Sequence, residues 1–244
     1  MISTSEFPWE LYAEIHSGNE GDLRYYLNAC PQGCEVLELG CGEGRVSGYL
    51  TSRGLSIFGL DLRKDALEEA QLRGVKVKIG DMAELSFDRS FDRVIAPYNT
   101  LLCLADKWKL ARCLRGVHRH LHVGGEFIFD VYSPDRNSLA GANGDYAIVK
   151  SIQYDGDIWD IFERSRERDS GKSILVQYRA VARTTRSTFT ISIAHLVIYA
   201  SEWWTILSEE GFEIISMEGD FTGDPVREDG GTLVVRVKKL DQHF

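Results

Sequence analysis

The sequence contains no run of about 18 apolar residues, the length that a membrane-spanning helix requires. Basic residues are also scarce, because 28 Lys and Arg stand against 37 Asp and Glu and the formal net charge is −9. One short basic cluster stands out, at residues 236–239. Since neutralised phosphates supply much of the affinity for nucleic acids, nucleic acid is disfavoured as a partner. We expect a soluble protein with no membrane segment.

Paired cysteines are absent as well. The cysteines form an odd set without a Cys-x-x-Cys pair, and no signal-like segment precedes them: Cys30, Cys34, Cys41, Cys103 and Cys113. Cys30 and Cys34 alone approach the spacing of a zinc site, but no second pair of ligands accompanies them. Reduced thiols in a cytoplasmic protein are the simplest account, and no metal site is expected.

Length and periodicity together indicate the fold class. The 244 residues can bury a full core, and they suit one domain with a substantial insertion better than two independent domains. Helical and strand patterns alternate through the first half of the chain. This alternation is typical of α/β proteins.

A glycine-rich loop follows the first predicted strand. Residues 36–39 form a short apolar run, and glycines stand at positions 40, 42 and 44 before helical spacing begins. The dinucleotide fingerprint needs its last glycine where this chain has Arg45, and the phosphate-loop ending Gly-Lys-Ser/Thr is missing. The loop predicts a binding edge of another kind, unless it is only a tight turn without a ligand.

At this loop the chain resembles the class I S-adenosylmethionine-dependent methyltransferases, whose first motif has the form Glu-x-Gly-x-Gly-x-Gly. The resemblance implies a Rossmann-like doubly wound sheet, mostly parallel with an antiparallel last strand, and S-adenosyl-L-methionine as the cofactor. Within the loop it assigns these residues to cofactor binding: Glu38, Gly40, Cys41, Gly42 and Gly44.

A carboxylate ends the second predicted strand, residues 55–60, and Asp61 lies 19 positions beyond Gly42. In a doubly wound sheet this carboxylate stands beside the first loop, where its two oxygens can accept hydrogen bonds from a ribose diol. Asp61 can also cap the helix expected at residues 64–73, and the two roles are compatible. The adjacent Leu62 is assigned to the cofactor site with it.

Further candidates follow the next two strands. The third strand, residues 75–79, ends before Asp81 and Met82, which the resemblance places at the adenine ring; a solvated turn is the alternative. The fourth strand, residues 91–96, precedes the loop that should approach the methyl donor. From this loop we select Ala96 and Tyr98 for cofactor binding, and Tyr98 and Asn99 for catalysis.

The loop after the fourth strand departs from one nucleic-acid signature. Enzymes that methylate exocyclic amines of nucleobases carry Asn/Asp-Pro-Pro-Tyr/Phe, whereas here a single proline follows Ala96. This difference further weakens the hypothesis of a nucleic-acid substrate and favours a small-molecule acceptor.

The fifth predicted strand, residues 127–131, closes at the same edge of the sheet. Asp130 and Tyr132 stand at its end and are candidate substrate contacts.

Three alternating histidines precede that strand and suggest a metal cluster: His118, His120 and His122. Helical spacing separates His120 from the other two, so we expect all three on the solvated face of a helix.

Strand-like runs replace the helical period between residues 138 and 199, and turn residues separate them. An antiparallel insertion at this place resembles a small-molecule subgroup that includes sugar-amine and glycine N-methyltransferases, in which the inserted sheet roofs the active site. The expected organisation is a core of residues 1–137 and 200–244, with residues 1–30 as a cover and residues 138–199 as a substrate lid.

The cover and the insertion supply the remaining candidates. In the resembling families the N-terminal piece folds over cofactor and substrate, often with an aromatic residue placed like Tyr12; plain packing of Trp9 and Tyr12 is the alternative. His16 stands as a substrate candidate, although a surface or capping role is commoner. His195 shares a strand face with apolar side chains, so it either points at the site from the roof or is a structural histidine.

We predict transfer of a methyl group from S-adenosyl-L-methionine to nitrogen or oxygen of a small metabolite. In-line displacement depends mainly on orientation, worth on the order of 7–11 kcal/mol, so the lack of an obvious base does not argue against activity. A cofactor-binding, non-catalytic partner subunit and a nucleotide-cofactor oxidoreductase are the alternatives, the latter weakened by Arg45. Both a monomer and a homodimer are compatible with the sequence.

Overall fold

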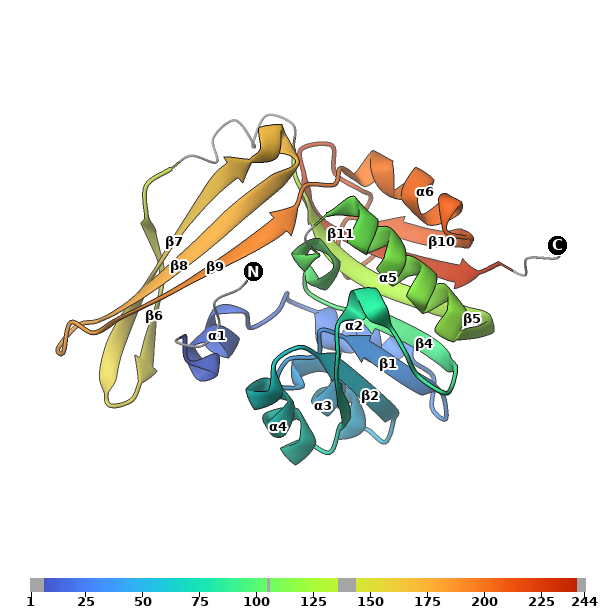
Figure 1. The fold of residues 1–244 in the computed structure, drawn as a ribbon, viewed down its shortest axis with the longest axis horizontal. Coiled ribbons are helices and arrows are strands. Elements are labelled where there is room, and N and C mark those ends of the chain that lie inside the picture. The colour runs from blue at the N-terminus through green and yellow to red at the C-terminus, as the bar shows by residue number, and fades with distance from the viewer. Residues whose placement is uncertain (1–6, 105, 136–143, 241–244) are drawn as a thin grey trace.

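The protein is described here by a computed structural model that covers residues 7–104, 106–135 and 144–240. A seven-stranded sheet forms its centre, with the order β10-β11-β5-β4-β1-β2-β3 (Figure 1). Six strands run parallel, and β11 is antiparallel to both of its neighbours. The strands are β1 Glu35–Leu39, β2 Ser56–Asp61, β3 Lys76–Ile79, β4 Phe91–Ala96, β5 Leu121–Ser133, β10 Phe212–Glu218 and β11 Gly231–Lys239. The predicted Rossmann-like sheet with an antiparallel last strand is confirmed.

Helices cover both faces of this sheet. Three of them pack on one face around residues such as Val36 and Ile57: α2 Asp22–Ala29, α3 Arg45–Thr51 and α4 Lys64–Leu72. The other face is covered by α5 Lys107–His120, α6 Ala200–Glu209 and the short 3₁₀ turns η1 Met82–Glu84 and η2 Thr100–Cys103. Each face therefore buries its own apolar cluster, as a doubly wound sheet requires.

The order of the strands places the functional edge. From β1 the chain continues to β2 and β3 on one side, and then crosses to β4 and β5 on the other. The loops after β1 and β4 consequently leave the sheet in opposite directions and open a crevice between them. The glycine loop and the Pro97–Thr100 segment lie at this crevice.

A second sheet stands beside the first (Figure 1), and its four antiparallel strands have the order β6-β7-β8-β9. They are β6 Ala147–Tyr154, β7 Asp157–Arg168, β8 Ser173–Ala182 and β9 Thr188–Leu196. Asp155 and Gly156 both have positive φ at the first hairpin, as a two-residue turn of the primed type requires. The strands and turns expected from the sequence in this region are thus present; residues 138–143 of the expected lid lie outside the described residues.

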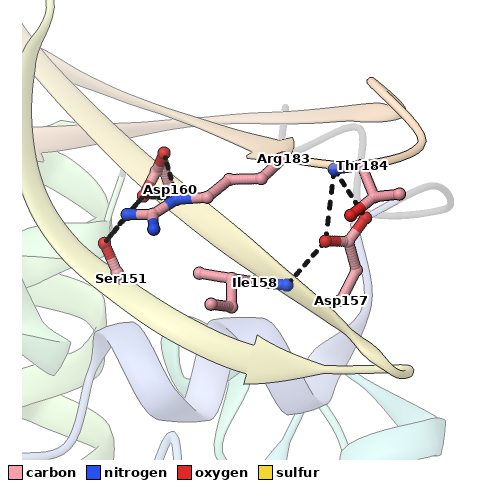
Figure 2. A network of polar contacts seen from close by, with 6 residues as sticks. All are labelled: Ser151, Asp157, Ile158, Asp160, Arg183 and Thr184. Atoms are coloured by element: carbon pink, nitrogen blue, oxygen red, sulfur yellow. Dashed lines mark hydrogen bonds and ion pairs between the residues drawn. The ribbon is translucent and has the colours of Figure 1, made fainter.

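Polar contacts hold the end of this sheet that lies away from the core (Figure 2). The Asp157 carboxylate accepts hydrogen bonds from the backbone N–H groups of Ile158 at 2.7 Å and Thr184 at 3.0 Å. Arg183 donates to Asp160 and, more weakly, to the hydroxyl of Ser151, at 2.8 and 3.3 Å. These contacts tie three strands together at their turns.

The N-terminal helix α1 Trp9–Ile15 packs on the second sheet rather than on the first. Phe7 and Leu11 join a buried cluster with residues of β6 to β9, among them Trp159 and Ile161. Lys150 of β6 also pairs with Glu14 of α1 at 3.5 Å. Helix α1 is therefore the inner layer of this sheet, which we call the roof (β6–β9).

The prediction that His118, His120 and His122 all lie on the solvated face of a helix is wrong. Helix α5 ends at His120, and β5 begins at Leu121 because Leu121 already pairs with Phe91 of β4, which leaves His122 exposed on the strand. His120 is buried: its Nδ1 pairs with the carbonyl of Gly116 at 2.7 Å, and its Nε2 accepts from the N–H of Phe87 at 3.0 Å. This imidazole secures the end of the helix.

Candidate active site

The glycine loop bends in the left-handed region at each of its glycines, with φ of +61°, +54° and +82° at Gly40, Gly42 and Gly44. Gly40 is exposed, and a Cβ there would lie 2.6 Å from Cγ2 of Thr100 in the loop after β4. A side chain at this position would therefore both strain the backbone and clash with Thr100. The close approach of the two loops depends on this glycine.

Glu38 and Cys41 lie behind the loop. The Glu38 carboxylate is buried and accepts a hydrogen bond from the N–H of Ser47 in α3 at 2.8 Å; burial raises its pKa to about 8. The buried Cys41 side chain packs against Gly59, where a Cβ would lie 2.5 Å from its Sγ. Both residues thus support the loop from within.

Asp61 joins the first two loops. Its Oδ2 accepts from the N–H of Gly42 at 2.9 Å, and its Oδ1 accepts from the N–H of Arg63 at 2.9 Å. Burial raises the pKa of this carboxyl above its usual value. Helix α4 begins after Arg63 and has no side-chain cap, so Asp61 does not cap it. Each carboxylate oxygen keeps a lone pair for a further donor.

Apolar side chains flank Asp61. Leu62 is 65% exposed, and Ile79, which pairs with Asp61 across β2 and β3, is 58% exposed. Ile79 was not among the residues selected from the sequence, because its place beside Asp61 follows from the register of the strands. Asp81 accepts from the N–H of Ala83 at 2.8 Å and so begins the η1 turn. An apolar ring held at this edge would cover surface that is otherwise left to water.

Met82 is partly buried against the core, next to Asp81. Ala96, at the end of β4, is fully buried, and Tyr132, directly before Ser133 at the end of β5, is 47% exposed. Trp9 is half-buried at the start of α1. Of these four residues, Met82 lies at the edge formed by Asp61, Leu62 and Ile79, because it directly follows Asp81.

Two consecutive residues after β4 adopt a strained backbone. Tyr98 and Asn99 have φ of +57° and +62°, a conformation uncommon outside glycine. The Asp130 carboxylate accepts from the N–H of Tyr98 at 2.9 Å, and the Asp130 carbonyl accepts from the N–H of Asn99 at 3.0 Å. The Asn99 side-chain oxygen in turn accepts from the N–H of Tyr132. The end of β5 therefore holds this loop in place.

Asp130 is 1% exposed and has further donors. Its Oδ1 accepts from the hydroxyl of Tyr26 at 2.6 Å, and its Oδ2 accepts from the side-chain amide of Asn19 at 3.2 Å. Burial raises the pKa of Asp130 to about 6. The residue lies beneath the site and binds protein groups on three sides.

Arg45 fastens the N-terminal segment to the core. Its guanidinium pairs with the buried Asp22 at 2.7 Å and lies 5.7 Å from the centre of the Tyr98 ring. The segment passes so close that a Cβ on Gly18 would lie 2.2 Å from an Arg45 nitrogen. From the sequence, Arg45 indicates only that the dinucleotide fingerprint is missing, and its ion pair with Asp22 was not predicted.

An aromatic cluster fills the space between α1, the β4 loop and the roof. The rings of Tyr12 and His16 stack at 4.0 Å, and His16 meets Tyr98 edge-on at 6.0 Å and Tyr178 of β8 at 5.2 Å. Arg63, which follows the Asp61 loop, lies 5.7 Å from the Tyr12 ring. The cluster thus reaches from the edge at Asp61 to the roof. Tyr178 was not among the residues selected from the sequence.

Both candidate histidines are desolvated. Burial lowers the pKa of His16 to about 4, and burial together with the neighbouring His16 lowers the pKa of His195 to about 4. His195 pairs with Ile174 across β9 and β8, on the roof face that carries Tyr178. Both imidazoles are therefore neutral at neutral pH, and burial disfavours their protonated forms.

Residues 36–125 match a family model described as a methyltransferase domain. The chain is 28% identical to the cypemycin N-terminal methyltransferase of a Streptomyces species over 231 residues, which cover 89% of this chain and 88% of that protein.

Solved structures share the fold. An S-adenosylmethionine-dependent methyltransferase from Clostridium acetobutylicum superposes with a TM-score of 0.80 at 17% identity, over 96% of this chain and 99% of that one. An amino pentose methyltransferase from Micromonospora echinaspora, solved with S-adenosylmethionine bound, gives a TM-score of 0.73 at 20% identity, over 96% and 98% of the two chains. Both likenesses extend through the roof as well as the core.

Proposed function

Since this chain belongs to the class I S-adenosylmethionine-dependent methyltransferases, we propose that its acceptor is a small molecule methylated on nitrogen or oxygen beneath the roof. The observation that carries the proposal is the continuity between the edge at Asp61 and the aromatic cluster. Tyr12 and His16 stack at 4.0 Å, and Tyr178 closes the cluster from the roof. A ring-sized acceptor would meet aromatic faces there, next to the cofactor edge.

The chain's own residues fit this cofactor. S-adenosylmethionine supplies a methyl group already activated on a sulfonium. Gly40 lets the backbone approach it, the free lone pairs of Asp61 suit a ribose diol, and the exposed faces of Leu62 and Ile79 suit the adenine ring. Asp81 and Met82 lie at the same edge.

Positioning is the main contribution that we assign to the loop after β4. Asp130 holds the backbone of Tyr98 and Asn99 in a fixed, strained conformation before any substrate arrives. His16 and His195 are neutral, and burial disfavours their protonated forms, so we assign them packing roles in the aromatic cluster and the roof rather than proton transfer. The roof and α1 would limit the access of water during transfer.

The same proposal covers partners and location. The formal net charge of −9 disfavours nucleic acid as the acceptor. Of the helices in the described residues, none is long and apolar enough to cross a lipid bilayer. We infer a cytoplasmic location from the five free cysteines.

Transfer of a labelled methyl group tests the proposal. The purified protein is incubated with methyl-labelled S-adenosylmethionine and a panel of amines and alcohols, among them aminosugars and short peptides with free N-termini. We expect labelled small-molecule product with the wild type and little with Asp61→Ala. If the protein binds S-adenosylhomocysteine but labels no member of the panel or of a metabolite extract, a non-catalytic partner subunit becomes the better account.

A further inference from the structure

One carboxylate on the inner face of the roof has no partner of opposite charge. Glu163 lies on β7, and its side chain shares the face of Trp159 and Ile161, which pack on α1. The residue is half-buried, and among the described residues no Lys, Arg or His nitrogen lies within ion-pair distance of it. A half-buried carboxylate without a counter-ion keeps its negative charge available to a cationic ligand.

The neighbours of Glu163 are aromatic. Glu163 stands directly opposite Tyr178 in the β7–β8 pair, and the two side chains interact. The Tyr178 ring lies 5.2 Å from His16, which in turn meets Tyr98 at 6.0 Å. Glu163 is also near enough to Tyr98 to influence its ionisation. The carboxylate therefore lies beside the aromatic cluster, next to Tyr178 of the roof.

A carboxylate set among electron-rich rings suits one chemical class of ligand. An ammonium group gains a charge-assisted hydrogen bond from the carboxylate and a cation–π contribution from tyrosine faces. A neutral hydroxyl forms a weaker hydrogen bond with the carboxylate and gains no cation–π contribution. Two cations of the protein near this cluster already have carboxylate partners: Arg45 pairs with Asp22, and Lys150 on the neighbouring strand β6 pairs with Glu14.

We propose that Glu163 is an acceptor-binding residue and that it selects a protonatable amine over an alcohol. This inference rests on the proposed function and deepens it from a small nucleophile to an amine. Glu163 binds the amine as its ammonium. The nitrogen gives that proton to water and bonds to the methyl carbon, while the carbon–sulfur pair stays on sulfur. The product is again an ammonium, which the same carboxylate can hold for a second transfer.

A pair of ligands that differ only in the charged group tests this selectivity without knowledge of the natural acceptor. Cyclohexylamine, an ammonium at neutral pH, and cyclohexanol are titrated by calorimetry into protein saturated with S-adenosylhomocysteine. We expect the wild type to bind the amine about ten- to a hundredfold more tightly, the range of one charge-assisted hydrogen bond. In Glu163→Gln the two ligands should bind within about twofold of each other.

Two further variants make the result specific. Glu163→Asp keeps a carboxylate and should keep part of the preference for the amine. Glu213→Gln removes one negative charge from an exposed ion pair with Lys238 on the core, and this variant should keep the full preference for the amine. Equal binding of amine and alcohol by the wild type, no binding of the amine, or an unchanged preference in Glu163→Gln would overturn the inference.

The affinity for S-adenosylhomocysteine separates this inference from the proposed function. All four proteins should bind it equally, which also shows that the variants are folded. If the wild type did not bind S-adenosylhomocysteine, the proposed function would be contradicted. If it bound S-adenosylhomocysteine but showed no preference for the amine over the alcohol, only the role of Glu163 would be contradicted.

Discussion

The guanidinium of Arg45, the first residue of α3, lies 2.7 Å from the carboxylate of Asp22, the first residue of α2. Asp22 is 2% exposed, so this ion pair is shielded from water. It joins the helix that follows the glycine loop to the start of α2, which the chain reaches directly from α1. The N-terminal segment and the glycine loop are thereby coupled through two side chains.

Breaking this pair on one side should be costly. Arg45→Met leaves Asp22 buried without its cation, and we expect the free energy of unfolding to fall by about 3–5 kcal/mol. Urea denaturation measures this change. The double variant Arg45→Met/Asp22→Asn removes the unpaired charge and should recover most of the loss; a single variant within about 1 kcal/mol of the wild type would show that the pair is not a structural anchor.

The glycine loop offers a steric prediction. Gly40→Ala combines a left-handed φ, worth about 1–2 kcal/mol, with a Cβ 2.6 Å from Cγ2 of Thr100. We expect lower thermal stability and weakened binding of S-adenosylhomocysteine. Gly124→Ala is the matched control, since Gly124 has φ of +74° and open space around its Cβ. Thr100→Ser, which removes Cγ2, should restore part of the binding; equal effects of the two alanine variants on binding would contradict the steric argument.

The two desolvated histidines give a pH dependence. The folded-state pKa of His16 and His195 is about 4, below the usual 6.5, so between these values the unfolded chain binds more protons than the folded protein. The free energy of unfolding should therefore fall as the pH falls from about 6.5 to 4, by on the order of 1.4 kcal/mol per pH unit for each histidine. Denaturation at several pH values measures the slope.

His16→Asn/His195→Asn should flatten this dependence, whereas His122→Asn, at an exposed position, should leave it as it is. An unchanged slope in the double variant would mean that other groups cause it, or that the two imidazoles are hydrated.

Local features of the chain predicted that the glycine loop and Asp61 lie together. The spacing of Gly40, Gly42 and Gly44 and the position of Asp61 after the second strand follow from short sequence patterns, and strand order then brings them together. The hairpins of the roof could be read from turn residues such as Asp155 and Gly156. These elements depend on neighbours in the chain, which periodicity and turn chemistry report directly.

The residues that we propose for acceptor binding could not be predicted in the same way. Glu163 and Tyr178 acquire their place from the register of β7 with β8, and a charged residue in a strand ordinarily faces solvent. His120 looked like part of a polar helix face, yet the 82–91 connection folds over it and supplies the N–H of Phe87. Such relationships arise only when distant segments of the chain pack together, so no local sequence pattern predicts them.

The central claim, that the crevice at Asp61 binds the nucleoside part of S-adenosylmethionine, is tested most directly by calorimetric titration of S-adenosylhomocysteine into wild type, Asp61→Ala and Asp65→Asn. Asp65 is exposed and pairs with Arg63 at 2.6 Å, so its variant controls for a lost charge next to the same loop. We predict tight binding by the wild type and Asp65→Asn, and a loss of about 1.5–3 kcal/mol, or ten- to a hundredfold, in Asp61→Ala. Equal binding by all three, or none by the folded wild type, would contradict the account.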